Sequence, residues 1–426
     1  MRELAILFSS LGRNRVSSMS DALSFDSNNF LRNGKHTSKY QNASPDDKNK
    51  NWLEGIFRKY YFYHYSQLEL GELINEHEFG FRLFDGKIRR HLTFNDKKEL
   101  YAYIIKFSPS DIFYSSSRYQ NPKAEIDQKG WIGSDLIFDI DGKDLHLECA
   151  QSHNLVLCKD CSFISKGIIS KCEGCNSTRL QIIDIPCAKC IKSLNGEVKK
   201  LVEILNDDFG IDNKCIFIYF SGNNGYHIHV VDENFYSASA KKRNAFAQYL
   251  MGKGYLIENL GITKNNGVLI PTHNKVIYNQ GWRRRIFDSM HLPIQNNRID
   301  DRFIKKYNRM QDTSNNNIKD IISTHIFDLS AKIDPNVTMD IHRIFRLAGS
   351  INSKSGLIKA FCKDLDSFNP FLDACFIGDS NVEIESKLNI KLLLKGKQFS
   401  IKTGTNTLPE YVAAYMICKG IGDIRE

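Results

Sequence analysis

Two aspartates stand one residue apart in the segment LIFDIDG, where an apolar run ends at a glycine. In a strand, side chains two residues apart point to the same face, so Asp139 and Asp141 are expected side by side, with Ile140 facing the core. Two neighbouring carboxylates repel each other, and ionising both is costly unless a cation lies between them. Mg²⁺ and Mn²⁺ prefer oxygen ligands, and a pair of such ions can hold the attacking and leaving oxygens of a phosphoryl transfer. The spacing alone fits two solvated aspartates at a strand end equally well.

A glycine turn in SGNNGYHIHV is the second candidate for chemistry. Ser221, Gly222 and Gly225 form a small-residue turn whose backbone N–H groups can approach phosphates. His227 follows at a position where a strand would aim its ring at the same site. The turn by itself is also typical of an ordinary hairpin.

A third polar segment, IDPNVTMDIHRIFRLAGSINSKSG, follows more than a hundred residues later. It supplies two acids and three basic residues: Asp334, Asp340, Arg343, Arg346 and Lys354. Without further context, this composition equally fits a solvated helix face and a polar turn.

Seven of the eleven cysteines lie between residues 149 and 190. In a chain without a secretory signal, clustered CxxC pairs indicate metal binding more often than disulfides. CKDC and CEGC have the spacing of a four-thiolate zinc ribbon with the ligands Cys158, Cys161, Cys172 and Cys175. The scattered cysteines are predicted to be core residues: Cys215, Cys362, Cys375 and Cys418.

Composition indicates a soluble globular protein with enough chain for more than one domain, since 42% of its 426 residues are hydrophobic and 25% are charged. No apolar run reaches the roughly 18 residues of a membrane span, and the opening apolar segment is too short for a secretory signal, so we expect a cytoplasmic protein without a membrane partner. The net charge of +9 suits a polyanionic partner.

The elements that must position these residues can be predicted from periodicity. Residues 1–51 are rich in Ser, Asn, Asp and Lys and are predicted to be a mobile extension. The pattern then predicts strands in EFGFRLF, IRRHLTF, WIGSDLIFDID and on both sides of the glycine turn, and helices in KKELYAYIIKF, SLNGEVKKLVEILNDDFGI and LPEYVAAYMICKG. Asn308–Lys319 is predicted to be a polar loop. This mixture favours an α+β or α/β enzyme-like fold.

The ordered combination of these segments resembles the small catalytic subunit of archaeal and eukaryotic DNA primase. The resemblance runs from about Phe57 to the C-terminal helix through EFGFRLF, IRRHLTF, KGWIGSDLIFDID, the SGxxGxH turn, WRRRIF and RLAGSINSKSG. It implies the α+β (α/β-type) primase fold, with a mixed-sheet catalytic core. Residues 52–426 would form the catalytic domain, with a zinc-binding insertion at about 149–190.

The resemblance also implies a role for particular residues. Asp139 and Asp141 would bind the catalytic Mg²⁺ or Mn²⁺ ions together with Asp334, rather than Asp340. The implied nucleotide-binding residues are Ser221, Gly222, His227, Arg343, Arg346, Lys354, Glu78 and Arg90. A second zinc site would use Cys149, His153, Cys187 and Cys190, which resemble the zinc knot of primase small subunits. The alternative is one zinc in the ribbon, with Cys149 and His153 as bystanders and Cys187 and Cys190 as free thiols.

Three departures from the family pattern concern the nucleotide site. Asn224 stands where the family usually has arginine, Asn352 where it usually has histidine, and Ala348 where it usually has proline. The two polar losses should weaken nucleotide binding unless other cations compensate, and the arginines at 283–285 are candidates for that role. Because the metal aspartates are intact, we expect an active enzyme; the alternative is an inactive regulatory paralogue.

The function implied by the resemblance is template-directed primer synthesis on single-stranded DNA from nucleoside triphosphates by a two-metal mechanism. The implied partner is a large iron–sulfur subunit, and the implied location is the nucleoid of an archaeal cell. Two other function classes stay open. One is a strand-nicking endonuclease that binds metal through His227 and His229, and the other is a noncatalytic nucleic-acid-binding protein built on zinc ribbons.

Overall fold

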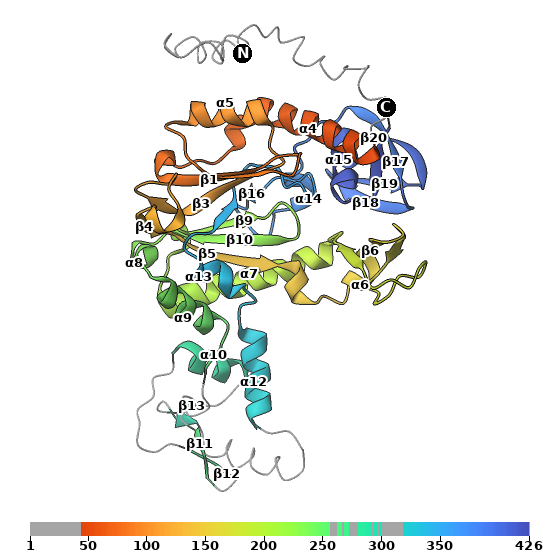
Figure 1. Ribbon diagram of the computed structural model, residues 1–426. Helices are drawn as coiled ribbons and strands as arrows, with labels where there is room; N and C mark the ends of the chain where they lie inside the picture. The colour runs from red at the N-terminus through yellow and green to blue at the C-terminus, as the bar shows by residue number, and fades with distance from the viewer. Residues whose placement is uncertain are drawn as a thin grey trace.

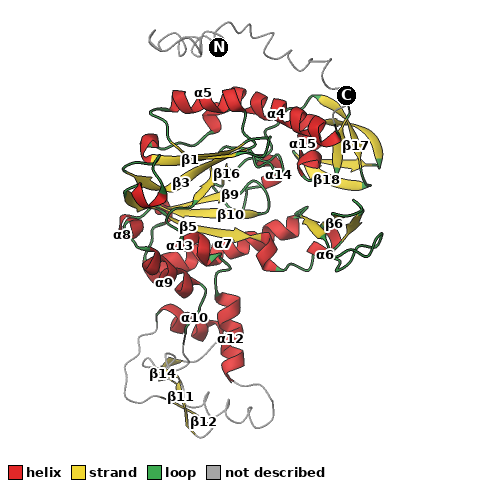
Figure 2. Ribbon diagram, in the orientation of Figure 1, coloured by secondary structure: helices red, strands yellow, loops and turns green. Residues whose placement is uncertain are grey.

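The computed structural model describes residues 44–255, 262–265, 268–271, 280–290, 294–295, 298–299 and 318–425. Two antiparallel sheets lie one above the other, with helices on their outer sides, as Figures 1 and 2 show. The α+β class predicted from the sequence is confirmed. None of the helices in the described ranges combines the length and apolarity needed to cross a bilayer.

The first sheet has the strand order β15 (Ile344–Arg346), β3 (Asp111–Tyr119), β1 (His77–Arg82), β2 (Ile88–Leu92), and β4 (Trp131–Ser134) also pairs with β3. Helices α4 (Pro45–Tyr63) and α5 (Lys97–Phe107) lie along its upper side in Figure 1. Helix α4 begins where the Ser44 side chain accepts a hydrogen bond from the Asp47 N–H and where proline occupies the first turn. Its buried side chains then face the sheet: Leu53, Ile56, Phe57, Tyr60 and Tyr61.

The second sheet has the order β16 (Ala360–Phe361), β9 (Ile216–Phe220), β10 (Gly225–Val230), β5 (Leu136–Asp141). Helices α7 (Ala188–Phe209), α9 (Ala240–Leu250) and α13 (Pro335–Met339) lie below it in Figure 1, and the short α8 (Glu233–Tyr236) precedes α9. Helix α7 buries apolar residues three or four apart, as a one-sided helix should, and ends at Gly210, whose φ of 66° suits glycine.

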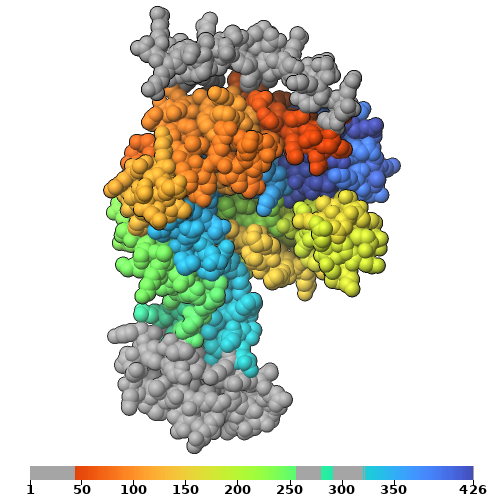
Figure 3. Space-filling model, in the orientation of Figure 1, coloured from red at the N-terminus to blue at the C-terminus, as the bar shows by residue number. Residues whose placement is uncertain are grey.

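The cysteine-rich insertion forms its own small unit. It consists of α6 (Ala150–His153) and a three-stranded sheet of β7 (Ile164–Lys166), β6 (Leu155–Cys158) and β8 (Leu180–Ile183). In Figure 3 it is the yellow-green lobe on the surface.

The C-terminal region contains α14 (Pro370–Asp373), the sheet β20 (Gly404–Pro409), β17 (Asn381–Ser386), β21 (Gly422–Ile424), and the hairpin β18 (Ile390–Leu394), β19 (Lys397–Ile401). Helix α15 (Glu410–Cys418) is buried along almost its whole length. The region between α9 and α13 holds α10 (Gly281–Ser289), α12 (Ile318–Leu329) and the short pairs β11 (Ile262–Asn265) with β12 (Val268–Pro271) and β13 (Ile294–Gln295) with β14 (Arg298–Ile299).

Most of the predicted elements are confirmed, with three differences. WIGSDLIFDID forms two strands, β4 and β5, which belong to different sheets and are separated at Asp135. Of the predicted loop at 308–319, residues 308–317 lie outside the described residues and the last two begin α12. Among the cysteines expected in the core, Cys362 and Cys375 are buried, whereas Cys215 and Cys418 are only partly so.

The predicted extension at 1–51 reaches into the first helix. Residues 1–43 lie outside the described residues, while 45–51 belong to α4. The division into an extension and a catalytic domain stays a prediction.

Candidate active site

Three aspartates from distant parts of the chain meet at one end of β5. Strand β10 pairs with β5 so that His227 lies opposite Asp139 and Gly225 opposite Asp141. Because paired residues of antiparallel strands share a face, both aspartates and His227 project to the same side. Asp334 joins them from the start of α13, since its backbone N–H donates to the Asp139 carbonyl oxygen over 3.1 Å.

Asp340 occupies the opposite end of the same short helix. There its side chain accepts a hydrogen bond from the His342 N–H over 2.9 Å, whereas the Asp334 side chain caps the start of α13 through the Asn336 N–H. Of these two acids, the structure thus brings Asp334 to the paired aspartates, which is the choice that the resemblance implies.

The charges at this site suit a bound cation. Burial, together with the neighbouring carboxylates of Asp141 and Asp334, raises the pKa of Asp139 to about 7 against the opposing effect of Lys143 and Arg343. Within the described part of the chain, Asp141 is the one of these three acids that pairs with a lysine or arginine; its carboxylate lies 2.9 Å from Lys143 Nζ. A hard divalent cation is the chemical group that such an oxygen cluster fits, because it would stabilise the ionised form of all three acids.

His227 is held as a neutral ring beside these acids. Its Nε2 lies 3.6 Å from Asp139 Oδ1. Burial lowers the pKa of His227 well below its usual value, and Lys359, Arg346 and Arg343 lower it further. Its buried Nδ1 has no hydrogen-bond partner among the described residues. A neutral imidazole with an unsatisfied nitrogen can donate to an incoming oxygen without bringing charge.

The glycine turn packs against the loop at 350–357. Gly222 has φ of +84°, and a Cβ atom there would lie 2.9 Å from Asn352 Cβ, so a larger residue would both strain the backbone and clash. Asn352 Nδ2 donates to the Ser221 carbonyl oxygen over 3.2 Å, and Ser355 Oγ donates to the Gly222 carbonyl oxygen. The exposed Lys354 follows Asn352 and donates its N–H to the Asn352 side chain over 3.0 Å.

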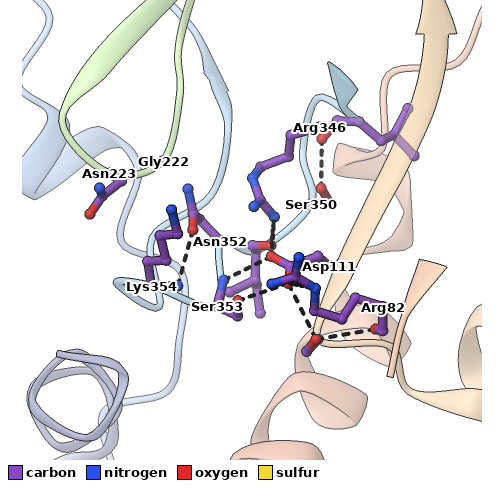
Figure 4. Close-up of polar contacts among 12 residues, drawn as sticks. Arg82, Asp111, Gly222, Asn223, Arg346, Ser350, Asn352, Ser353 and Lys354 are labelled. Atoms are coloured by element: carbon purple, nitrogen blue, oxygen red, sulfur yellow. Dashed lines mark hydrogen bonds and ion pairs between the residues drawn. The ribbon is translucent and has the colours of Figure 1, made fainter. Parts of the chain in front are cut away.

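Figure 4 shows that a buried carboxylate, Asp111 of β3, anchors the other side of this loop. Asp111 Oδ1 pairs with Arg346 Nη1 at 2.7 Å, and its Oδ2 accepts from Ser353 Oγ over 2.8 Å. Although burial opposes it, Arg346 and Ser353 hold the pKa of Asp111 below its usual value, so the acid is ionised. Arg346 also donates to the Ile351 carbonyl oxygen over 2.7 Å. In this arrangement, Arg346 fixes the loop that carries Lys354.

Glu78 and Arg90, the two predicted residues of the first sheet, pair with each other. Glu78 Oε1 lies 2.9 Å from Arg90 Nε, and its Oε2 lies 3.2 Å from Lys129 Nζ. Although burial raises it, Arg90, the His91 N–H and Lys129 together hold the pKa of Glu78 below its usual value. The buried Lys129 was not predicted from the sequence.

Two further lysines lie at the site without having been predicted. Lys419, at the end of α15, donates from Nζ to Asn223 Oδ1 of the glycine turn over 2.8 Å. Burial lowers its pKa to about 8 against the opposing effect of Asp184, and nearby Lys354 also lowers it. Lys359 Nζ lies 3.1 Å from His229 Nε2, and burial lowers its pKa to about 7.

The candidate arginines at 283–285 contact other residues than the glycine turn. Arg284 Nη2 lies 2.7 Å from Asp207 Oδ2, and Arg285 Nε lies 3.1 Å from Asp208 Oδ2, both acids being on α7. Arg283 lies over the Phe287 ring. The expectation that these residues serve the glycine turn is therefore wrong for Arg284 and Arg285, whereas Lys419 does reach the turn.

The clustered cysteines form two sets of four ligands. In each set the ligand atoms all lie within 4.8 Å of one another: Cys158, Cys161, Cys172 and Cys175 in one, and Cys149, His153, Cys187 and Cys190 in the other. Sulfur pairs such as Cys149–Cys190 and Cys158–Cys175 are 3.5 Å apart, near the roughly 3.8 Å between thiolates that share a tetrahedral Zn²⁺. Both sets can bind zinc.

Comparisons with known proteins show the family to which this chain is similar. The pattern of the family described as DNA primase small subunit matches residues 138–363, which include the three aspartates and the glycine turn. The DNA primase small subunit PriS of Nitrosopumilus maritimus is 38% identical over 88% of this chain and 98% of its own. The proteins of that name from Cenarchaeum symbiosum and Archaeoglobus fulgidus are 34% and 30% identical, each over 87% of this chain and 97% of their own.

The fold, the aspartate site and these matches define an enzyme of the nucleotidyltransferase type. The chain belongs to the DNA primase small subunit family, and it is a catalytic primase subunit.

Proposed function

We propose that this chain synthesises primers on a single-stranded DNA template from nucleoside triphosphates, and that Asp139, Asp141 and Asp334 bind two Mg²⁺ or Mn²⁺ ions. The observation that carries the proposal is the meeting of these acids, with Asp139 at a pKa of about 7. Such ions, when bound, stabilise the attacking 3′-hydroxyl oxygen and the leaving pyrophosphate.

The chain's own residues bind and orient the nucleotide. The backbone of the turn at Ser221 and Gly222 would approach the phosphates, and the neutral His227 would donate to a phosphate oxygen. Lys354, in the loop that packs on the turn, and Lys419, which contacts Asn223 of the turn, would neutralise the triphosphate, with Arg343 near Asp139. Arg346, Glu78 and Arg90 would act by fixing the surrounding backbone, since each is already engaged in an ion pair.

Replacing Lys419 by methionine should raise the KM for nucleotide about tenfold while changing kcat much less. A charge-assisted contact to phosphate contributes roughly 1.5–3 kcal/mol, and about 1.4 kcal/mol corresponds to tenfold. Lys419→Arg should restore most of the affinity. Steady-state incorporation at varied nucleotide concentration measures both constants.

The matched control is Lys387→Met, in the same C-terminal region, where the lysine pairs with Asp423 at 3.2 Å. This change should leave the KM as it is in the wild type. An unaltered KM in Lys419→Met would show that this lysine serves only to hold Asn223.

Several finer features belong to the same proposal. The family's designation as a small subunit supports a heterodimer with a larger primase subunit, and the two ligand sets support two zinc ions. We further propose that the complex works in the cytoplasm at the nucleoid, where its template lies.

The nicking alternative is disfavoured by the surroundings of His229. Its Nε2 lies 3.1 Å from Lys359 Nζ, so the lysine occupies the side of the ring nitrogen where a metal ion would have to bind. A mixture of single-stranded DNA, nucleotides and Mn²⁺ should therefore give primers and no nicks. Nicks without primers would refute the proposed function.

A further inference from the structure

The sheet face that carries the aspartates continues to the opposite edge of the second sheet. Pairing places Asp139 beside His227, His227 beside Tyr219, and Tyr219 beside Phe361, in one row across β5, β10, β9 and β16. Figure 1 shows these four strands in this order. With about 4.8 Å between neighbouring strands, Phe361 lies roughly 14 Å from Asp139 on the same face.

Three aromatic rings gather at the far end of this row. The Phe361 and Tyr219 ring centroids are 5.4 Å apart, and those of Phe361 and Phe217 are 6.4 Å apart. Phe217 pairs with His229 and so shares the face. Phe361 is 42% exposed on β16, the edge strand. We refer to Phe217, Tyr219 and Phe361 as the aromatic edge.

Polar contacts hold the aromatic edge in place. The Tyr219 hydroxyl donates to Glu69 Oε2 over 2.9 Å, and Lys359 Nζ lies 4.8 Å from the centre of the Tyr219 ring. Lys359 is 1% exposed and forms no ion pair with a carboxylate of the described residues. The rings are therefore held in place beside a buried lysine.

We propose that the aromatic edge stacks unpaired bases of the single-stranded DNA template. This inference rests on the proposed function, because a template-directed enzyme must hold unpaired bases near its metal site. Aromatic rings stack on bases of any sequence, because every base offers a flat π-face. The row shared with Asp139 and His227 makes the aromatic edge continuous with the site of the reaction.

The test measures binding of a fluorescent oligodeoxythymidine to the full chain by anisotropy. Phe361→Ala should weaken binding about tenfold, within the range for loss of one stacked base. Phe361→Trp should keep the affinity, and its added indole fluorescence should be quenched by the oligonucleotide. Phe327→Ala, which removes a 64% exposed ring from α12, is the matched control and should bind as the wild type does.

An abasic oligonucleotide separates stacking from charge. It should bind equally to the wild type and to Phe361→Ala, since neither complex has a base to stack. Unchanged binding of oligodeoxythymidine to Phe361→Ala, or an equal loss with the abasic strand, would overturn the proposal. So would a defect confined to binding of the large subunit, because the aromatic edge would then be a protein interface.

The proposed function can fail independently of this inference. Asp139→Asn should bind the oligonucleotide as the wild type does while making no primer. If Asp139→Asn still made primers, the metal assignment would fall and the stacking result would stand. If Phe361→Ala bound normally while Asp139→Asn lost synthesis, stacking would fall and the metal assignment would stand.

Discussion

Asp139→Asn should abolish nucleotidyl transfer, while the metal-free variant should be as stable as the wild type or more stable. The amide is a poor ligand for a hard divalent cation, because it has one oxygen fewer than the carboxylate and no negative charge. In the absence of metal, however, the substitution removes one of two adjacent carboxylates and relieves a repulsion of roughly 1 kcal/mol for a partly exposed pair. Primer synthesis in Mn²⁺ and thermal unfolding in EDTA measure the two effects separately.

The stability difference between the wild type and Asp139→Asn should depend on pH. The pKa of Asp139 is raised from 3.8 in the unfolded chain to about 7 in the folded one. The folded protein therefore binds the extra proton between these values, and this residue's contribution to the free energy of unfolding falls as the pH rises from about 4 to 7. In EDTA, the wild type should lose stability relative to Asp139→Asn across this window, and the two should converge below pH 4.

The two ends of α13 provide a matched comparison for the metal site. Asp334→Asn should abolish synthesis as Asp139→Asn does, whereas Asp340→Asn should retain most of it. Each side chain accepts one backbone N–H, Asp334 as the N-cap of α13 and Asp340 in the turn that follows the helix, so the cost in stability should be similar. An active Asp139→Asn variant, or equal activity of the two α13 variants, would contradict the assignment.

Two zinc ions per chain are expected. The site formed by Cys149, His153, Cys187 and Cys190 should matter far more for stability than the four-cysteine ribbon. Cys190 is buried at the start of α7, which packs against the second sheet, whereas Cys161 is exposed in the surface lobe. Structural zinc contributes roughly 10 kcal/mol or more of apparent binding free energy at neutral pH, comparable to the stability of a whole domain. Cys190→Ser should therefore lower the Tm by about 10 °C or more.

Cys161→Ser should lose one zinc ion and unfold only the ribbon, leaving the main unfolding transition nearly unchanged. The control is Cys215→Ser, a partly buried cysteine outside both ligand sets, which should keep both ions. Elemental analysis of the wild type that gives one zinc ion or none per chain would refute the assignment of two zinc sites.

The parts of the site that the sequence predicts are those built from local patterns. The alternation in LIFDIDG and the glycines of the following turn define β5, β9 and β10, and pairing of the strands then brings Asp139 to His227. Local pattern could not choose between Asp334 and Asp340, since either acid can cap a short helix. The family resemblance implies Asp334, and the structure gives the physical reason where the Asp334 N–H meets β5.

The residues that sequence reasoning missed act over long separations. Lys419 contacts a side chain 196 residues earlier, and in the sequence it is an ordinary lysine after a helix. Asp111 lies 242 residues before Ser353, in a strand whose pattern carries no sign of a buried ion pair. Such contacts depend on how the sheets and the C-terminal region pack together, which periodicity does not encode.

The departures at Asn224 and Asn352 also acquire a physical reason. The Asn224 carbonyl oxygen accepts the Gly142 N–H over 2.8 Å, and its buried side chain packs against Gly142. Asn352 links the glycine turn to the loop that carries Lys354. Both residues therefore build the site, while Lys419 supplies a cation to the same turn.

Template-programmed incorporation is the most direct test of the central claim. The full chain is incubated with Mn²⁺, each labelled nucleotide in turn, and a single-stranded template of one repeated base, with Asp139→Asn as the control. We predict products that contain only the nucleotide complementary to the template, and none from the variant. Incorporation that ignores the template, or that persists in Asp139→Asn, would contradict the claim that this chain is a template-directed polymerase acting through its aspartates.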